Sequence, residues 1–327
     1  MNHADSLDGL IFAYILDGRG GGRTLDWTGV EQWRPDDGIL WIHLDYTKQR
    51  VQQWLTASSG LNELSVEILK EQDTRPRILN SEEGLFLILR AVNPNPGADP
   101  EDMVSLRMHY TDRRIITMRQ RPVAALEDIT RALESGSGPE NAGDFMVMAA
   151  DRIADRLGEI VSDITDQADE LEDSVLTGES AEMRPRLANI RRQGIRLRRY
   201  IAPQRDVLTR LLSEKVPWID GQARLRLREI AERSARFVED IDSARDRAAI
   251  TLEELNHQLS EQTNRAMYVL AIVTAIFLPL GLFTGLLGTN VRGIPGADHP
   301  AAFFIVTFIL LAIAASLVWL FKRIRWL

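Results

Sequence analysis

Two long runs without a charged residue, both near the C-terminus, restrict what this chain can fold into. The first run covers residues 266–288 and the second covers residues 301–321. A helix rises about 1.5 Å per residue, so either run is long enough to cross a hydrocarbon core about 30 Å thick. A buried helix of a soluble core seldom continues this far without a charge. We therefore expect two transmembrane helices, joined by a loop at 289–300.

The basic residues around these runs predict their orientation. Arg265 lies directly before the first run, Arg292 is the only Lys or Arg of the loop, and three basic residues lie in the tail, 322–327. Basic residues accumulate on the cytoplasmic side of membrane helices. We expect both chain ends in the cytoplasm and the loop in the periplasm, as in a multi-pass protein of a bacterial-type inner membrane. The apolar stretch Leu10–Leu16 follows acidic residues, so we expect a buried strand there and not a secretory leader.

The remaining part of the chain is rich in charge, and its composition excludes several classes of function. The 327 residues carry a formal net charge of −8, which argues against nucleic acid as a partner. There is no cysteine, so disulfides and thiolate zinc sites are excluded. The glycine-rich stretch 18–23 lacks the lysine of a phosphate-binding loop, and we expect a flexible loop between strands there. No catalytic constellation is evident, and we expect neither an enzyme nor a bound cofactor.

Residues 1–121 are expected to form a cytosolic α/β domain. Short apolar or alternating segments predict strands, and segments with helical spacing lie between them. The composition of 93–102 predicts a loop, and Tyr110–Arg113 predicts a hairpin turn. The expected strands are Leu10–Leu16, Leu40–Leu44, Arg77–Leu79, Leu85–Arg90, Val104–His109 and Arg114–Met118, and the expected helices are Val51–Leu55 and Leu61–Lys70.

Residues 122–265 are expected to form a helical stalk. Apolar residues with helical spacing cover 145–176 and 187–211, and a third helix is expected to begin near Trp218. Its apolar stripe alternates steps of three and four residues, with one extra step of four, which is typical of a coiled coil. No helix breaker separates this stripe from the first apolar run, so one helix is expected from about Trp218 to Gly288. The stripe consists of Leu227, Ile230, Ser234, Phe237, Ile241, Ala244, Ala248, Leu252, Leu255 and Leu259.

A short glycine-containing stretch follows this long helix, with Gly288, Thr289 and Asn290 and then VRGIPG at 291–296. Together with YIAPQRDVLTRLL at 200–212, this organisation resembles the CorA-type divalent-cation transporter superfamily over nearly the whole chain. The VRGIPG stretch is similar to the ZntB-like zinc transporter branch. The resemblance implies a homopentameric funnel in which the first membrane helix lines a central pore. It also implies that the partners are further copies of the chain, the lipid bilayer and divalent cations.

The motif Gly288, Thr289 and Asn290 is the expected selectivity loop. Asn has a carbonyl acceptor, and a ring of such carbonyls can hold a hydrated cation through its water shell. The alternative is that the motif merely ends the helix, because Gly and Asn favour left-handed C-caps. One face of the first membrane helix is smaller and more polar than the rest and is the expected pore lining. This face carries Asn264, Met267, Ala271, Thr274, Leu278, Gly281 and Gly285.

Candidate metal ligands are expected at the two mouths of the pore. On the inner side, Glu253, His257 and Glu261 lie one turn apart on one helix face. On the outer side, Asp298 and His299 lie in the loop. A ring of copies would bring the inner residues together around an axis. The alternative for the inner residues is an exposed polar stripe.

From these observations we expect a transporter of Zn²⁺, with Ni²⁺, Co²⁺ and Cd²⁺ as further cargo. The resemblance to the zinc branch implies proton coupling, and uptake is the expected direction, although a passive pore follows the gradient of its ion. A Mg²⁺/Co²⁺ channel of the same fold is the alternative, because Thr289 and Arg292 leave the selectivity open. A membrane-anchored coiled-coil sensor or scaffold is the alternative from another class. The acidic segment 163–173 is expected to be a solvated helix face.

Overall fold

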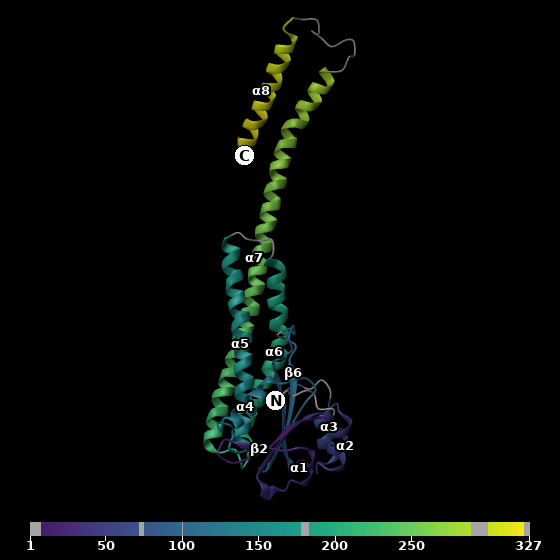
Figure 1. The fold of residues 1–327 in the computed structure, drawn as a ribbon. Helices are drawn as coiled ribbons and strands as arrows, with labels where there is room; N and C mark the ends of the chain where they lie inside the picture. Colours follow the sequence, from purple (N-terminus) through teal and green to yellow (C-terminus); the bar gives the residue numbers. More distant parts are fainter. Residues whose placement is uncertain (1–7, 72–74, 100, 178–182, 289–299, 324–327) are drawn as a thin grey trace. The chain divides into compact units, whose positions relative to one another are not determined.

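The computed structural model describes residues 8–71, 75–99, 101–177, 183–288 and 300–323. The chain divides into two compact units, Met1–Leu252 and Glu253–Leu327. The first unit contains a sheet with its flanking helices and a group of long helices, and the second contains two apolar helical segments (Figure 1). Helix α7, Gly221–Leu287, belongs to both units.

Seven strands form one mixed sheet in the order β2-β1-β3-β7-β6-β5-β4. All neighbouring strands are antiparallel except β3 and β7, which run parallel. The six strands expected from the sequence are all present, and the Tyr110–Arg113 turn joins β6 to β7 as a hairpin. The strands are β1 (Leu10–Leu16), β2 (Gly22–Thr24), β3 (Ile39–Asp45), β4 (Arg77–Ser81), β5 (Gly84–Ala91), β6 (Val104–Tyr110) and β7 (Arg114–Arg119).

Strand β2 corrects one expectation, because it begins inside the stretch 18–23, for which the sequence predicts a loop. It pairs with β1 through Tyr14 opposite Thr24 and Leu16 opposite Gly22. All three residues of β2 are exposed. Its pairing therefore rests on backbone hydrogen bonds, and an apolar pattern does not reveal such a strand.

The helices of the first unit agree with the expected ones. Three further elements, α1, η1 and α4, were not predicted individually from the sequence. Helix α3 begins two residues later than expected, because the Asn62 side chain accepts a hydrogen bond from the Ser65 N–H at 2.8 Å and caps it. The elements are α1 (Trp27–Gln32), η1 (Pro35–Asp37), α2 (Gln49–Ala57), α3 (Glu63–Lys70), α4 (Ala124–Glu134), α5 (Ala142–Thr177) and α6 (Met183–Ser213).

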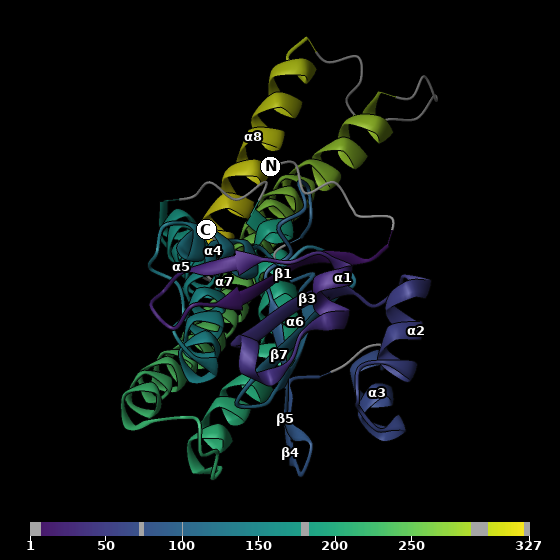
Figure 2. The same cartoon turned by 60° about the horizontal axis from the view of Figure 1, so that its bottom comes forward.

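The sheet is the middle of three layers, because successive side chains of β3 point to opposite faces. Ile42 and Leu44 belong to the core cluster that includes residues of α1, α2 and α3. On the opposite face, the Trp41 ring meets the Phe145 ring of α5, with centroids 4.7 Å apart. Figure 2 shows α2 and α3 on one side of the sheet and α5 on the other.

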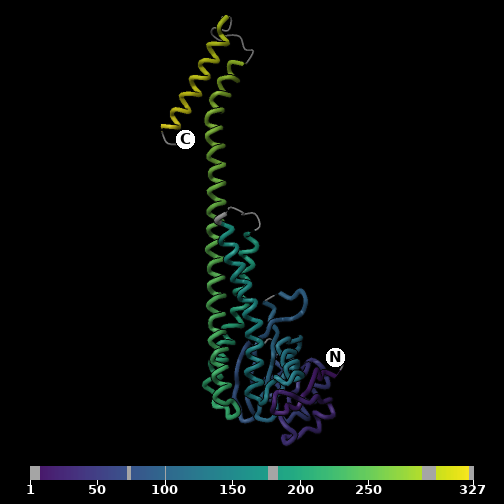
Figure 3. Tube along the Cα trace, turned by 60° about the vertical axis from the view of Figure 1, so that its left-hand side comes forward, coloured from purple at the N-terminus to yellow at the C-terminus, as the bar shows by residue number. Residues whose placement is uncertain are grey.

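Helices α5, α6 and the first part of α7 lie side by side within the first unit (Figures 1 and 3). The apolar stripe of α7 is confirmed as a packed seam, since Leu227, Ile241 and Ala248 are all buried. Beside this seam, Arg233 of α7 forms ion pairs with Asp151 and Asp155 of α5, at 2.7 and 2.8 Å. The long helix expected from about Trp218 begins at Gly221.

The second unit consists of the end of α7 and helix α8, Ala302–Arg323, and the chain reverses direction between them (Figure 1). Both segments are long and apolar enough to cross a membrane. Their large apolar side chains are exposed, for example Phe277 and Phe308. The expected fold class is confirmed, because the chain has an α/β unit, a long helix and two C-terminal apolar helices. The homopentameric funnel and the domain boundaries at 121 and 265 stay predictions.

Candidate functional site

The expected pore face lies on the part of α7 that belongs to the second unit. Each of its residues is exposed in the single chain, and the two glycines, Gly281 and Gly285, have open space where a Cβ would stand. At these two glycines the face leaves room for whatever covers it, which suits close helix packing as well as a water-filled path. The exposed residues are Asn264, Met267, Ala271, Thr274, Leu278, Gly281 and Gly285.

Thr274 contributes a hydroxyl group to this face. Its Oγ1 donates a hydrogen bond to the Leu270 carbonyl at 2.8 Å. The proton of the hydroxyl is therefore used within the helix, while the oxygen keeps lone pairs that can accept from water. Thr274 can contact a hydrated cation through an ordered water without leaving a polar group unpaired in the apolar segment.

Pro279 lies inside α7 and was not among the residues expected to matter, although it is visible as a proline inside the first apolar run. A proline has no N–H, so the carbonyl of Ala275 cannot receive its usual helical hydrogen bond. Such a carbonyl at membrane depth needs water or another donor, and it lies within one turn of Thr274. The helix therefore presents two oxygen acceptors in the same region.

The expected selectivity loop is described only at its first residue. Gly288 donates its N–H to the Thr284 carbonyl at 2.8 Å and directly follows the end of α7. A Cβ at Gly288 would lie 2.9 Å from that carbonyl, and Gly288 is not among the glycines with positive φ. Close approach, and not a left-handed cap, therefore favours glycine here. Thr289 and Asn290 lie outside the described residues.

The inner candidate ligands Glu253, His257 and Glu261 are all exposed, while Leu255, between them in sequence, is buried. They occupy one face of a single helix. Within the described residues, no three His, Asp or Glu side chains come together as a metal site. The outer candidates Asp298 and His299 lie outside the described residues. One chain alone therefore does not assemble a metal site from the residues that the structure describes.

The acidic segment 163–173 of α5 alternates buried apolar residues with exposed acidic ones. Glu170 pairs with Arg186 of α6 at 3.2 Å, and Asp169 pairs with Arg247 of α7. The segment is a solvated helix face that also holds neighbouring helices, as the sequence predicts.

The α/β unit, the long helix that continues out of it and the two exposed apolar helices together define a membrane protein with a large α/β part. The chain belongs to the CorA-like Mg²⁺ transporter protein family, whose model matches residues 36–323. The resemblance to the CorA-type superfamily, which Gly288, Thr289, Asn290 and the VRGIPG stretch indicate, is therefore confirmed.

Two curated relatives match almost the full chain. The divalent cation transporter CmaX of Pseudomonas aeruginosa is 40% identical over 98% of this chain and 97% of its own length. The zinc transport protein ZntB of Yersinia pseudotuberculosis is 35% identical over 97% of this chain and 96% of its own length. The structure of the full-length CmaX protein superposes with a TM-score of 0.86 and 39% identity, and covers 98% of both chains.

Proposed function

We propose that this chain carries Zn²⁺ across a bacterial inner membrane through a pore that the exposed face of α7 lines. The observation that carries the proposal is the composition of that face. Thr274 is held by an intrahelical hydrogen bond, and the neighbouring positions toward the C-terminus include two glycines with open space above them. Polar side chains such as Asn264 and Thr274 are more favourable beside water than in lipid, and the two glycines leave room for it.

Several copies are needed for such a path, because two helices cannot enclose water. The exposed apolar side chains of α7 and α8 require lipid or further copies to cover them. The family resemblance favours five copies. Each copy would contribute one Asn290 to the outer end of the pore, and one set of Glu253, His257 and Glu261 to the inner end.

The ion travels with its water shell in this proposal. No Asp, Glu, His or Cys occurs between Ala266 and Val291. Zn²⁺ prefers those ligands when it loses its water, so the span offers no site that would trap it. Weak contacts through water let an ion both enter and leave. The similarity to ZntB supports zinc as cargo, and proton coupling and uptake belong to the same proposal.

A Mg²⁺ channel is the second candidate, and two observations favour it. The family model is described as a Mg²⁺ transporter. The oxygen acceptors at Thr274 and Ala275 also suit Mg²⁺, which keeps its water and binds through it.

Flux measurements on the full-length protein in liposomes separate these candidates. Zn²⁺, Ni²⁺, Co²⁺, Cd²⁺ and Mg²⁺ are compared at equal concentration, for the native chain, Asn290→Ala and Thr307→Val. Thr307 is a matched control, because its hydroxyl donates to the Phe303 carbonyl within α8, away from the proposed pore face. We expect Zn²⁺ flux that Asn290→Ala abolishes and Thr307→Val preserves.

The remaining outcomes contradict parts of the proposal. Mg²⁺ flux far above Zn²⁺ flux would establish the second candidate. Unchanged flux in Asn290→Ala, with assembly intact, would remove Asn290 from the pore. Absence of flux for every ion would favour a membrane-anchored scaffold.

A further inference from the structure

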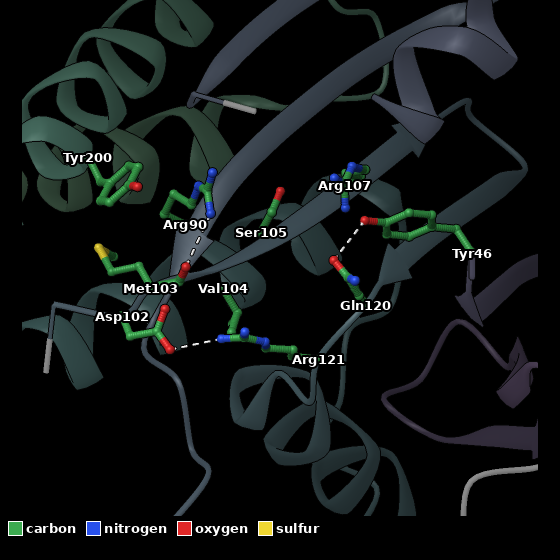
Figure 4. Close-up of a pocket in the computed structure, with 10 residues that line it drawn as sticks. All are labelled: Tyr46, Arg90, Asp102, Met103, Val104, Ser105, Arg107, Gln120, Arg121 and Tyr200. Carbon is green, nitrogen blue, oxygen red and sulfur yellow. Dashed lines mark hydrogen bonds and ion pairs between the residues drawn. The ribbon is translucent and has the colours of Figure 1, made fainter. Parts of the chain in front are cut away.

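A cavity of about 270 Å³ opens at one end of the strands of the sheet, and the residues that line it are far in sequence from the apolar helices (Figure 4). It lies where the parallel strands β3 and β7 end, and where β5 ends opposite the start of β6. In open α/β sheets, ligands commonly bind beyond the carboxyl ends of the strands. Three arginines line the cavity, Arg90, Arg107 and Arg121, and Asp102 is the one acidic side chain among the described residues that line it.

Arg107 is the most deeply buried of these cations, with 2% of its surface exposed. Its Nη2 donates to the Glu71 carbonyl at 2.6 Å, and its guanidinium lies 4.3 Å from the centroid of the Tyr46 ring. The Glu71 carboxylate pairs with Arg77 instead. Among the described residues, no carboxylate forms an ion pair with Arg107, and its Nε has no hydrogen-bond partner. Arg107 is therefore a buried cation that no carboxylate contacts directly among the described residues, and the Glu71 charge acts on it only from a greater distance.

This arrangement is costly for the protein in the absence of an anion. Burial lowers the pKa of Arg107, and the positive charge of Arg90 acts in the same direction against the opposing effects of Tyr46 and Glu71. A guanidinium stays charged under all ordinary conditions, so its desolvation has to be offset by an interaction. The Glu71 carbonyl and the Tyr46 ring offset part of it, and an anion in the cavity would add a direct counter-charge.

The other two arginines hold the walls of the cavity. Arg90 donates from Nη1 to the Met103 carbonyl at 3.1 Å, and its guanidinium lies 4.7 Å from the centroid of the Tyr200 ring. Arg121 stands at the rim, about half exposed, and pairs with Asp102 at 2.8 Å. The three cations come from β5, β6 and the segment after β7, so the sheet fixes their spacing.

We propose that this cavity binds a small anion that carries two or more phosphate groups. Guanidinium groups match phosphate oxygens with paired hydrogen bonds, and two of them around one cavity favour a polyanion over a single carboxylate. An arginine covers one face of the Tyr46 ring and one face of the Tyr200 ring, so less of each ring is available to stack on a nucleobase. We therefore take the phosphates, and not a base, as the recognised part of the ligand.

Isothermal titration of the full-length protein in detergent, with divalent cations removed by EDTA, tests this proposal. The probes are pyrophosphate, inorganic phosphate and ATP. We expect one saturable pyrophosphate site per chain. The dissociation constant of ATP is expected to lie within about threefold of that of pyrophosphate, because the base of ATP makes no contact. Orthophosphate is expected to bind at least tenfold more weakly than pyrophosphate. ATP that binds far more tightly than pyrophosphate would overturn the phosphate-only recognition.

Variants connect the binding to the cavity. Arg107→Met keeps the length of the side chain without its charge and is expected to weaken pyrophosphate binding at least tenfold. Arg121→Gln, at the exposed rim, removes the ion pair that neutralises Asp102 beside the anion and is expected to weaken binding several-fold even if Arg107→Met does not fold. Arg113→Ala is the control, because it removes an exposed cation from the turn at the other end of β6. Absence of saturable binding in the native protein, or equal binding in Arg121→Gln and Arg113→Ala, would overturn the proposal.

Discussion

The Gln204 side chain accepts a hydrogen bond from the Arg90 backbone N–H at 2.7 Å, and both residues are buried. Strand β4 pairs with β5 only from Gly84 to Ile88. Beyond Ile88, helix α6 therefore supplies the acceptor that a neighbouring strand would otherwise provide. This bond joins the sheet to α6, next to the contact between the Arg90 guanidinium and the Tyr200 ring.

Gln204→Leu is expected to lower the free energy of unfolding by about 1–3 kcal/mol, because it leaves a buried N–H without an acceptor. Gln204→Glu keeps an acceptor oxygen at the same place, so its free energy of unfolding should fall clearly less. Chemical denaturation followed by tryptophan fluorescence measures both changes. If the leucine variant is as stable as the native chain, the bond does not hold the sheet to α6.

Helices α5 and α7 approach closely at Gly158, where a Cβ would lie 3.0 Å from Cζ of Phe237. Glycine inside a helix is less favourable than alanine by roughly 1 kcal/mol. Gly158→Ala is therefore expected to be close to neutral, because the gain in helix propensity offsets a small shift of the half-buried ring. Gly158→Leu is expected to destabilise the protein by about 1–3 kcal/mol through overpacking. Thermal unfolding of both variants checks this order, and a leucine variant as stable as the alanine variant would contradict the close approach.

His109 makes the stability of the sheet depend on pH. Its Nε2 lies 3.1 Å from the Glu83 carbonyl, and its Nδ1 has no partner among the described residues. Burial, and then the positive charge of Arg114, lower the pKa of His109 to about 4. An imidazole in the unfolded chain has a pKa of about 6.5. Between these two values the unfolded state binds a proton that the folded state does not bind, so stability falls as the pH falls from about 6.5 to about 4.

The expected loss from His109 is up to about 3 kcal/mol at the lower end of this window, and it is absent above pH 6.5. His109→Gln cannot take up this proton and is expected to lose less stability between pH 7 and pH 4.5. Denaturation curves at the two pH values measure the difference. Carboxylates and the buried His43 contribute equally to both proteins, so an identical loss in both would show that His109 is not responsible.

The elements that repeat a pattern over many residues are the ones that the sequence predicts well. The stripe from Leu227 to Leu259 predicts one helix, and that helix ends at Leu287, one residue before the expected end. Most strands of the sheet follow from their apolar or alternating sequences. Strand β2 does not, because its exposed residues carry no pattern and its partner β1 alone defines it.

The cavity around Arg107 could not be predicted from the sequence for a different reason. The residues that line it lie after β3, in β5, just before and within β6, after β7, and in α6. No short motif contains them, and Arg107 in the sequence is only one polar residue in an alternating strand. What identifies it is the loss of water around its guanidinium, which exists only after the fold has formed. The pore face, by contrast, follows from the spacing of residues along one helix, while its use as a pore stays a prediction.

The orientation of the two apolar helices is a prediction that fusion proteins can check. Basic residues flank the hairpin at Arg265 and in the tail 322–327, which favours both ends in the cytoplasm. A reporter fused at Asp298 is expected to be active in the periplasm, and one fused after Leu327 is expected to be active in the cytoplasm. The opposite pattern would overturn the orientation and, with it, the assignment of an inner and an outer mouth.

Proton dependence, if the chain carries zinc, has to arise at the mouths of the pore. Proton-coupled carriers usually place an Asp, Glu or His at membrane depth as a relay. This chain has none from Ala266 to Val291 and none from Ala301 to Phe321. The candidates are therefore His257 at the proposed inner mouth and His299 in the loop, since histidine is the side chain that most often acts as a pH switch.

We expect the pH dependence of zinc flux to weaken in His257→Ala or in His299→Ala and to survive in Thr274→Val. The Thr274 hydroxyl donates to the Leu270 carbonyl within the helix, so valine removes an acceptor for water without breaking a contact to another element. Flux of ⁶⁵Zn²⁺ into liposomes between about pH 5.5 and 8, the range around the ordinary pKa of histidine, measures the three profiles. If both histidine variants keep the native profile while Thr274→Val abolishes it, protons travel along the hydroxyl and water of the α7 face, and the mouths have no part in the coupling.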